Sequence, residues 1–400
     1  MRNNEKYYEF NGSGSENSQS RSTEKNNTII IWWPNAVFSD IHWRHDPGQI
    51  PLELKKLGYK VTLVVGFFRS KMKHEEVDVV ETYVERKEGS VPNLHDCLVS
   101  TKSMVRLVRQ YHPKSIIIIQ YPLEALIFIA LLRLKIVTRS RPSLIVLFDV
   151  VPEEVKVSNK RLVDVFYRFL FSILSDKITT YTECNLAELT RPKLISNYKN
   201  KYSVISPGFT PEKGGNEDKT SMRRYNRILS VGRITYQKGH DLLISIFSKI
   251  VSKFPDWELR IVGMLDDKPY FESLERKVAD LNLQGSVKLL TDLSDEQLDR
   301  EYEEASIFCL LSRYESFGIS RAEAIYHELP MVISETGCGI YYKRFGSFVC
   351  KIDDQDCITN ALESLILDEG LRKEIAKRQK GAARTWHDVA VDFSNLIERL

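Results

Sequence analysis

The chain has 400 residues, of which 42% are hydrophobic, 10% aromatic and 28% charged, and this composition excludes collagen-like, coiled-coil and wholly disordered classes. The length predicts two or three domains. The net charge is only +3, but residues 1–210 carry 30 Lys and Arg against 22 Asp and Glu, whereas residues 211–400 carry 27 against 32. A basic half joined to an acidic half indicates two different functional surfaces.

The N-terminal segment, residues 1–27, is rich in Asn, Ser, Glu and Lys and has no apolar run, so we expect a disordered tail and not a signal peptide. The most apolar stretch, residues 115–132, is interrupted by Gln120, Pro122 and Glu124, which argues against a transmembrane helix. The scattered cysteines predict neither a zinc site nor a disulfide framework, and favour a reducing, cytoplasmic location. They are Cys97, Cys184, Cys309, Cys338, Cys350 and Cys357.

Short apolar runs alternate with longer amphipathic segments in the first half of the chain. The runs predict strands at 28–33, 61–66, 115–120, 143–148, 177–181 and 202–205. The segments between them predict helices at 47–57, 96–111, 123–134 and 160–174. This alternation is typical of βαβ units that form a parallel sheet covered on both faces.

The alternation breaks after residue 205, where Gly, Pro and charged residues predominate, and we place an interdomain linker at 209–225. It then restarts, with strands expected at 227–231, 258–262, 286–290 and 307–311 and helices at 240–254, 270–281 and 294–304. We therefore expect two doubly wound, Rossmann-like α/β domains, 28–208 and 226–383. Their ligand should lie in the cleft between the carboxyl ends of the two sheets.

The first chemically suggestive segment is residues 231–241, VGRITYQKGHD, which follows a predicted strand and opens onto a helix. Gly232 is expected to allow a tight turn, and Arg233 and Lys238 can converge on one anion near the helix N-terminus. A diphosphate suits such a site, although a solvated turn with exposed basic residues fits this segment equally well. Neither a dinucleotide fingerprint nor a P-loop spacing is present.

The second segment is residues 313–324, RYESFGISRAEA, which follows the strand predicted at 307–311. Glu315 falls in the strand-to-helix turn, and Glu323 falls on the helix. Carboxylates suit sugar hydroxyls because each accepts several hydrogen bonds. The amides at the helix start can hold phosphate oxygens, at Phe317, Gly318, Ile319 and Ser320. The alternative is a helix N-terminus that carries Glu only to complement its dipole.

With these motifs in view, residues 226–340 resemble the nucleotide-binding domain of the retaining glycosyltransferases of family 4, which have the GT-B fold. The matching pieces, in order, are ILSVGRITYQKGHDLLISIF, LRIVG, EASIFCLLSRYESFGISRAEAI with its E-x7-E pair, and LPMVISETGCG. The tail from Thr385, TWHDVAVDFSNLIERL, is similar to the closing helix of that family. The resemblance implies that residues 384–400 cross back to the first domain.

The resemblance also implies roles for individual residues. Gly232, Arg233 and Lys238 would bind the donor diphosphate, and Glu315 would contact the sugar being transferred. Glu323 would bind the ribose hydroxyls. The segment from Phe317 to Ser320 would bind the distal phosphate and sugar.

The chain departs from the family pattern at three places. Glu328 stands where relatives often have Gly before the A-x-G-x-P proline, so we expect the preceding helix to close differently. Phe148 stands where many relatives have His, which leaves Asp149 as the candidate catalytic residue of the first domain or as a structural cap. The loop 34–48 lacks the common double Gly, and its HWRH run, residues 42–45, either shapes acceptor binding or is surface.

Two carboxylates, Asp354 and Asp356, form a literal D-x-D beyond the donor motifs, but we do not expect them to bind a metal. Arg233, Lys238 and helix amides would meet the donor charge. We therefore expect neither a metal nor another cofactor to be required.

A strongly basic stretch, residues 101–141, carries eight cations and one acid beside the apolar helix predicted at 123–134. Such a combination favours contact with an anionic membrane surface, the alternative being a core helix with a solvated face. The cations are Lys102, Arg106, Arg109, Lys114, Arg133, Lys135, Arg139 and Arg141.

The sequence therefore predicts a hexosyltransferase-type enzyme (EC 2.4) that moves a sugar from a nucleoside diphosphate donor to a hydroxyl acceptor with retention. The expected acceptor is a lipid-linked or cell-surface glycan precursor, met at the cytoplasmic membrane face. Two rivals remain at this stage. One is another nucleotide-sugar enzyme, such as an epimerase, and the weaker one is a nucleic-acid-binding protein, for which no recognised motif is present.

Overall fold

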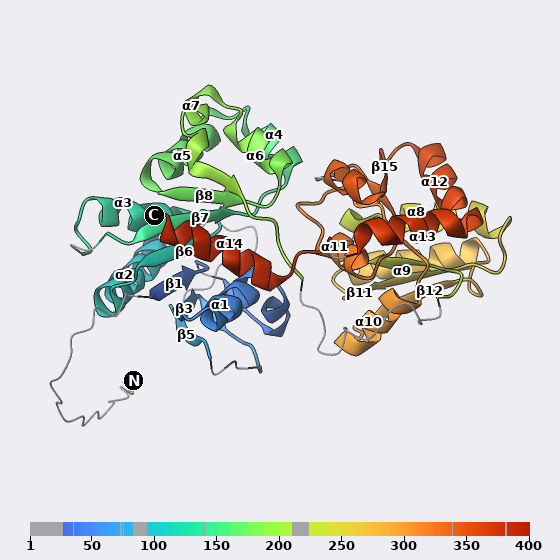
Figure 1. The fold of residues 1–400 in the computed structure, drawn as a ribbon, viewed down its shortest axis with the longest axis horizontal. Helices are drawn as coiled ribbons and strands as arrows, with labels where there is room; N and C mark the ends of the chain where they lie inside the picture. Colours follow the sequence, from blue (N-terminus) through green and yellow to red (C-terminus); the bar gives the residue numbers. More distant parts are fainter. Residues whose placement is uncertain are drawn as a thin grey trace.

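The structure is a computed structural model that describes residues 27–34, 36–72, 74, 76–82, 94–138, 141–209, 224–337, 339–380 and 382–400. These residues form two α/β domains that lie side by side (Figure 1). The expected tail, apart from Asn27, and most of the expected linker lie outside the described residues.

The first domain contains a seven-stranded parallel sheet with the strand order β5-β3-β1-β6-β7-β8-β9. Its central strands are runs of β-branched residues buried on both faces, because helices cover both sides of the sheet. The strands are β1 (Thr28–Trp32), β3 (Lys60–Val65), β5 (Asp78–Glu81), β6 (Ser115–Ile119), β7 (Ser143–Phe148), β8 (Lys177–Thr180) and β9 (Tyr202–Val204). Two short strands, β2 (Val37–Phe38) and β4 (Phe67–Phe68), pair separately.

Helices connect these strands in the alternating order that is typical of βαβ units. They are α1 (Asp46–Lys56), α2 (Leu94–Tyr111), α3 (Leu123–Arg133), α4 (Pro152–Ser158), α5 (Leu162–Leu174), α6 (Glu183–Thr190) and α7 (Lys193–Ser196), with 3-10 turns η1 (Asp40–Arg44) and η2 (Lys199–Lys201).

The second domain repeats the design with a six-stranded parallel sheet in the order β12-β11-β10-β13-β14-β15. Its strands are β10 (Arg227–Val231), β11 (Glu258–Gly263), β12 (Val287–Thr291), β13 (Ile307–Leu310), β14 (Met331–Ser334) and β15 (Phe348–Cys350). Its helices are α8 (His240–Val251), α9 (Lys268–Asp280), α10 (Asp295–Glu304), α11 (Ile319–Tyr326), α12 (Gln355–Leu367) and α13 (Glu369–Gln379), with 3-10 turns η4 (Tyr236–Lys238) and η5 (Gly339–Phe345).

The last helix, α14 (Trp386–Glu398), lies on the first domain, where Figure 1 shows it in red beside α1. Its Ser394 and Glu398 hydrogen-bond the Tyr59 hydroxyl at 2.8 and 3.0 Å, and Lys114 pairs with Glu398 at 2.6 Å. Phe209 and Thr385 form a parallel bridge where the chain passes between the domains.

The predicted alternation is confirmed, and the strands predicted at 143–148 and 227–231 match β7 and β10 to the residue. The elements that the sequence analysis did not predict are mostly short, such as β5, α6 and α7. In a segment of eight residues or fewer, the burial period is too brief to show in the sequence.

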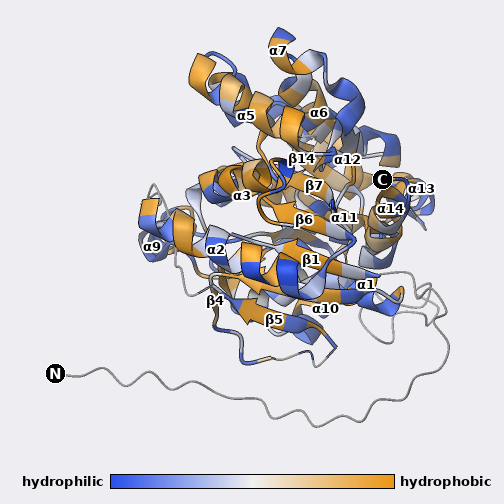
Figure 2. Cartoon of the chain, turned by 90° about the vertical axis from the view of Figure 1, so that its left-hand side faces the viewer, coloured by the Kyte–Doolittle hydropathy of each residue, from blue (hydrophilic) through white to orange (hydrophobic). Residues whose placement is uncertain are grey.

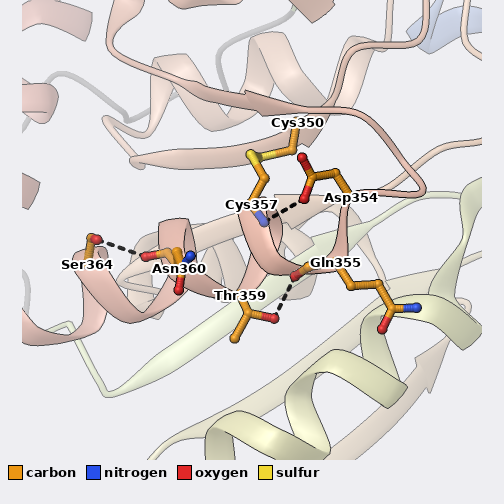
Figure 3. The surroundings of a disulfide bond; sticks show 7 residues. All are labelled: Cys350, Asp354, Gln355, Cys357, Thr359, Asn360 and Ser364. Atoms are coloured by element: carbon orange, nitrogen blue, oxygen red, sulfur yellow. Dashed lines mark hydrogen bonds between the residues drawn. A yellow bond between two sulfur atoms is a disulfide. The ribbon is translucent and has the colours of Figure 1, made fainter.

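The prediction of no disulfides is wrong at the edge of the second sheet, where Cys350 and Cys357 are bonded (Figure 3). The two cysteines are seven positions apart in sequence, and the chain turns back between β15 and α12, which brings their Cα atoms to 5.9 Å from each other. Cys184 is disulfide-bonded as well. Asp354, from the D-x-D, caps α12 by accepting from the amide of Cys357 at 2.9 Å, so its role here is structural.

The helix expected to touch a membrane, α3, is largely a core helix, since Phe128, Ile129 and Leu132 are buried. Arg133 is also engaged, donating to the Leu174 carbonyl and to Asp176, and Arg139 lies outside the described residues. Within the described ranges, no helix is both long enough and apolar enough to span a bilayer.

Candidate functional site

The two predicted ligand-binding segments meet at the carboxyl edge of the second sheet because β10 and β13 are neighbouring parallel strands. Several hydrogen bonds join the turn after β10 to the turn after β13. The Arg313 amide donates to the Gln237 carbonyl at 2.7 Å, and the Gln237 side chain donates to the Tyr314 carbonyl at 2.9 Å. Residues 77 positions apart in the chain therefore form one surface.

Lys238 and Glu315 form an ion pair at the centre of this surface, with 2.7 Å between Nζ and Oε2. The exposed fractions of the two side chains are 12% and 7%. Burial alone would raise the pKa of Glu315, but the charges of Lys238 and Arg321 outweigh it and lower that pKa. The Ser312 hydroxyl also donates to Glu315 at 3.1 Å. The carboxylate is therefore ionised and fixed in position.

Gly232 lies at a bend directly after β10, and since its φ is not positive, glycine is needed there for close approach and not for a left-handed backbone. A Cβ at this position would lie 3.2 Å from Cδ of Lys238, so the aliphatic part of the lysine packs over the glycine. On the other side, a Cβ on Gly263 would lie 1.9 Å from the Gly232 carbonyl oxygen. The pair of glycines leaves the room that Lys238 requires.

Arg233 is half exposed and pairs with Asp266 at 2.8 Å. Beneath it, the buried His240 lies with Nε2 3.3 Å from the Arg233 carbonyl oxygen. Burial lowers the pKa of His240 to about 4, so the imidazole is neutral at physiological pH. Lys238 and Arg233 are thus the two cations of this turn, which an uncharged histidine supports.

The turn before α11 is shaped around a buried arginine. Gly318 has a φ of 81°, and a Cβ there would lie 2.9 Å from Cδ of Arg321. Phe317 is 5% exposed and belongs to the core, so only its backbone can face a ligand. Ile319 and Ser320 occupy the first turn of α11 and are partly exposed.

Arg321 was not among the predicted site residues. Its side chain is fully buried, and its guanidinium donates to the Thr336 carbonyl at 3.2 Å and the Ser334 hydroxyl at 3.4 Å. Its charge helps to lower the pKa of Glu315. In the sequence it stands two residues before the proposed ribose-binding Glu323 and resembles an ordinary surface residue of a helix, and its role follows only from its burial and its close approach to Gly318.

Glu323 receives a hydrogen bond from a residue that the sequence did not connect with it. The Tyr302 hydroxyl, from the end of α10, donates to Oε2 of Glu323 at 2.7 Å. Tyr302 is 2% exposed, so its side chain has little freedom. It therefore fixes one oxygen of the Glu323 carboxylate in position.

Asp149 faces the second domain from the end of β7. Ser316 hydrogen-bonds its carboxylate across the cleft. Desolvation by the surrounding protein atoms raises the pKa of Asp149 to about 6. The Ser316 hydrogen bond opposes this rise, and the negative charges of Glu315 and Glu154 add to it. The two candidate catalytic residues, Glu315 and Asp149, therefore lie near each other across the cleft.

A second carboxylate of the first domain belongs to the same group. Asp46, in the first turn of α1, is 8% exposed, and burial followed by the charge of Asp149 raises its pKa to about 7. The sequence analysis missed Asp46, because the D-P-G segment reads as a helix start. Only the tertiary fold places it against Asp149.

The departures from the family pattern have structural outcomes. Phe148 is fully buried and stacks on Tyr121 with ring centroids 4.3 Å apart, so it points away from the cleft. Trp43 is also buried, and its Nε1 donates to the Ser70 hydroxyl at 3.0 Å, which gives it a core role. His42 hydrogen-bonds Ser39, while the side chain of Arg44 lies outside the described ones.

The expectation that α11 closes differently at Glu328 is wrong. Glu328 has a φ of 54°, the left-handed conformation that glycine favours after a helix. The Leu329 amide donates to the Ala324 carbonyl at 2.9 Å, and the Glu328 amide donates to the Ile325 carbonyl at 3.0 Å, as in a Schellman closure. The backbone therefore has the shape that a glycine would give it, and Glu328, a non-glycine residue, takes the unfavourable left-handed conformation.

One cluster has side chains of the kinds that bind metals, namely Asp299, Glu303 and His327, whose ligand atoms lie within 4.8 Å of one another. His327 Nε2 is 3.0 Å from Asp299 Oδ1. The cluster sits at the C-terminal end of α11, whereas the predicted phosphate-binding amides are at its N-terminal end. It therefore does not belong to the surface formed by Lys238 and Glu315.

Comparison with known proteins agrees with this geometry. The family described as "Glycosyl transferases group 1" matches residues 216–382, which include both ligand-binding segments. The amylovoran biosynthesis glycosyltransferase AmsD of Erwinia amylovora is 29% identical over 208 residues, covering 51% of this chain and 56% of that protein. The chain spans about 55–61% of the length of the first curated relatives that it matches.

Solved structures match over nearly the whole chain. A sucrose-phosphate synthase from Thermosynechococcus elongatus superposes with a TM-score of 0.70 at 16% identity, covering 93% of this chain and 98% of that one. Anabaena Alr3699/HepE, solved in complex with UDP-glucose, superposes with a TM-score of 0.65 at 12% identity, covering 93% and 100%. The two parallel sheets, the matching motifs and these likenesses show that residues 216–382 belong to the group 1 glycosyltransferase family (GT4) and that the chain has the GT-B fold.

Proposed function

We propose that this protein transfers a sugar from a nucleoside diphosphate sugar to a hydroxyl acceptor with retention of anomeric configuration. The observation that carries the proposal is the buried Lys238–Glu315 pair at the carboxyl edge of the second sheet, facing Asp149 of the first domain. A cation for a diphosphate and an ionised carboxylate for sugar hydroxyls are held within hydrogen-bond distance of each other. The UDP-glucose complex of Alr3699/HepE, which has the same fold, supports a nucleotide-sugar donor.

In this proposal, Arg233 and Lys238 stabilise the charge that develops on the departing diphosphate. Glu315 holds the hydroxyls of the transferred sugar and favours positive charge at its ring, while Glu323 binds the ribose. The backbone of Phe317, Gly318, Ile319 and Ser320 binds the distal phosphate and sugar, and Gly232 makes room for Lys238. Asp149 accepts a hydrogen bond from the acceptor hydroxyl and orients it toward the donor.

We propose that no divalent cation is required, because two cations and the amides at the start of α11 meet the donor charge. Turnover measured with and without EDTA tests this point. Unchanged rates are expected, and a loss of activity that Mg²⁺ or Mn²⁺ restores would contradict it.

A screen of nucleoside diphosphate sugars by thermal shift, followed by hydrolysis assays on the hits, tests the donor assignment. Lys238→Ala and Arg233→Ala should each lower kcat/KM at least tenfold, since a hydrogen bond to a charged group contributes about 1.5–3 kcal/mol. Arg276→Ala, on the exposed face of α9, is the control and should behave as wild type. Wild-type kinetics in both site variants would contradict the proposal, and donor isomerisation without an acceptor would indicate an epimerase instead.

For the acceptor, we propose a lipid-linked or cell-surface glycan precursor met at the cytoplasmic face of a membrane. The polysaccharide relative AmsD supports a glycan acceptor. The larger exposed apolar face lies on α5, with Leu162, Val163 and Phe166 exposed by 86%, 78% and 54%. Figure 2 shows α5 as largely hydrophobic, and the exposed cations Lys160 and Arg161 precede it. A basic, apolar helix of this kind suits an anionic bilayer surface.

Co-sedimentation with vesicles tests the membrane part. Binding to anionic vesicles should fade as salt rises, because the Debye length shrinks from about 10 Å at 0.1 M to about 3 Å at 1 M. Replacing Leu162, Val163 and Phe166 together by Ser should abolish it, whereas neutralising Lys135 and Arg141 should reduce it less. Absence of binding to anionic vesicles at low salt would exclude a membrane-bound acceptor.

A further inference from the structure

A pocket of about 260 Å³ lies in the first domain, apart from the surface formed by Lys238 and Glu315. It is lined by residues that follow β6 and β7 at their carboxyl ends and by residues of α4 and α5. Val150, which lines it, is next to Asp149 in the chain. The pocket therefore adjoins the place from which an acceptor would reach the donor. Its lining residues are Tyr121, Val150, Glu154, Val155, Ser158, Asp164, Tyr167 and Arg168.

The distinctive member of this lining is Arg168, whose side chain is only 2% exposed. Its two hydrogen bonds go to uncharged oxygens. Nη2 donates to Oδ1 of Asn159 at 2.6 Å, and Nε donates to the Asp164 carbonyl at 3.3 Å. Nη1 is buried and has no hydrogen-bond partner in the described part of the chain. A buried guanidinium normally meets an anion, because an unpaired buried charge and an unsatisfied donor are both costly.

We propose that this pocket binds an oxyanion group of the acceptor, a carboxylate or a phosphate, through Arg168. The inference rests on the proposed transferase function and adds the chemical class of the acceptor to it. An oxyanion in this pocket would give the guanidinium a directly bound ionic partner in addition to the two neutral oxygens to which it now donates. The guanidinium is well suited to this, since it presents several donors in one plane.

The rest of the lining fits a sugar that carries such a group. Tyr121 and Tyr167 offer aromatic faces, and the Tyr167 hydroxyl donates to the Tyr121 carbonyl at 2.9 Å, which fixes the relation of the two residues. Two carboxylates, Glu154 and Asp164, also line the pocket and can accept from hydroxyls. Because their negative charges repel an anion, neutralising one of them should strengthen anion binding, which provides a test.

The experiment uses the full chain with the diphosphate site saturated by the nucleoside diphosphate that the donor screen identifies. Inorganic phosphate, D-glucuronate and neutral D-glucose are then titrated by calorimetry and thermal shift. We expect phosphate or glucuronate to bind more tightly than glucose, and the preferred one distinguishes a phosphorylated acceptor from a uronic acid. If neither binds better than glucose while the nucleotide still binds, the pocket proposal fails and the transferase proposal stands.

Three variants complete the test. Arg168→Gln should weaken anion binding at least tenfold with nucleotide affinity unchanged, and Arg133→Gln, outside the pocket, should leave both unchanged. Glu154→Gln, at an exposed position, should tighten anion binding about twofold to fivefold by removing repulsion. Anion affinity that is unchanged in Arg168→Gln would overturn the proposal. If that variant does not fold, an unchanged or weaker affinity in Glu154→Gln would overturn it.

Discussion

Lys238 and Glu315 neutralise each other at 2.7 Å in a site where both are more than four-fifths buried. Little of either side chain is exposed to water before the donor arrives. Donor binding therefore replaces one ionic partner by another and removes little water from the two charged groups. A group held in this way needs little reorganisation when the diphosphate and sugar bind, which is the condition for electrostatic catalysis.

Removing one member of the pair should destabilise the protein. Lys238→Ala leaves a buried carboxylate without its main counter-charge, and we expect the free energy of unfolding at pH 7 to fall by about 3 kcal/mol. Arg233→Ala, whose side chain is half exposed, should change it by less than about 0.5 kcal/mol. Urea denaturation measures both. The double variant Lys238→Ala/Glu315→Ala should recover part of the loss, and strictly additive losses would show that the pair is not coupled.

Tyr302 should act through Glu323. Tyr302→Phe removes the 2.7 Å hydrogen bond to Glu323 and keeps the ring, so we expect nucleotide affinity to fall about threefold to tenfold with kcat nearly unchanged. Glu323→Ala should lower the same affinity further. Calorimetry with the nucleoside diphosphate checks both. Glu315→Gln is the contrasting variant, because it should lower turnover more than nucleotide affinity.

The fold should become less stable as the solution becomes more basic, because of Asp46. Its pKa is raised to about 7 from an unfolded value near 3.8, so between these values the folded protein binds more protons than the unfolded one. The contribution of this group to the free energy of unfolding therefore falls as pH rises from about 4 to about 7. Asp46→Asn should raise stability at pH 8 by on the order of 2 kcal/mol and have little effect at pH 4. An equal effect at both pH values would contradict the assignment.

The left-handed residue after α11 offers a stability test. Glu328→Gly relieves a conformation that costs an L-residue about 1 kcal/mol, whereas Glu328→Ala removes the same side chain without that relief. We expect the Gly variant to be more stable than the Ala variant by about 1 kcal/mol in urea denaturation. The comparison cancels any loss of the attraction between Glu328 and Arg224. Equal stability of the two variants would show that the site is unstrained.

The sequence predicted those features whose cause is local. The runs Ile29–Ile31 and Ile116–Ile119 predicted strands buried on both faces, and the residues of the predicted site, apart from Asp149, lie in two continuous segments after such strands. Tyr302, Asp46 and Arg168 could not be found in this way. Tyr302 and Asp46 each act on a residue of another segment, and Arg168 is buried beside a pocket that only the tertiary fold creates, so nothing in their sequence neighbours indicates these roles. The Cys350–Cys357 bond was missed although only seven positions separate the two residues, because the sequence does not show that the chain turns back between β15 and α12.

The crossing between the domains has a mechanical consequence. The chain passes there twice, and the two passages are tied together: the Phe209 amide donates to the Arg384 carbonyl at 3.0 Å, and the Trp386 amide donates to the Phe209 carbonyl at 3.2 Å. Gly208 lies so close to the second passage that a Cβ would come within 2.4 Å of the Thr385 backbone. Any sliding of the two passages past each other would break these hydrogen bonds. We therefore expect a change in the angle between the two domains to pivot close to Phe209 and Thr385.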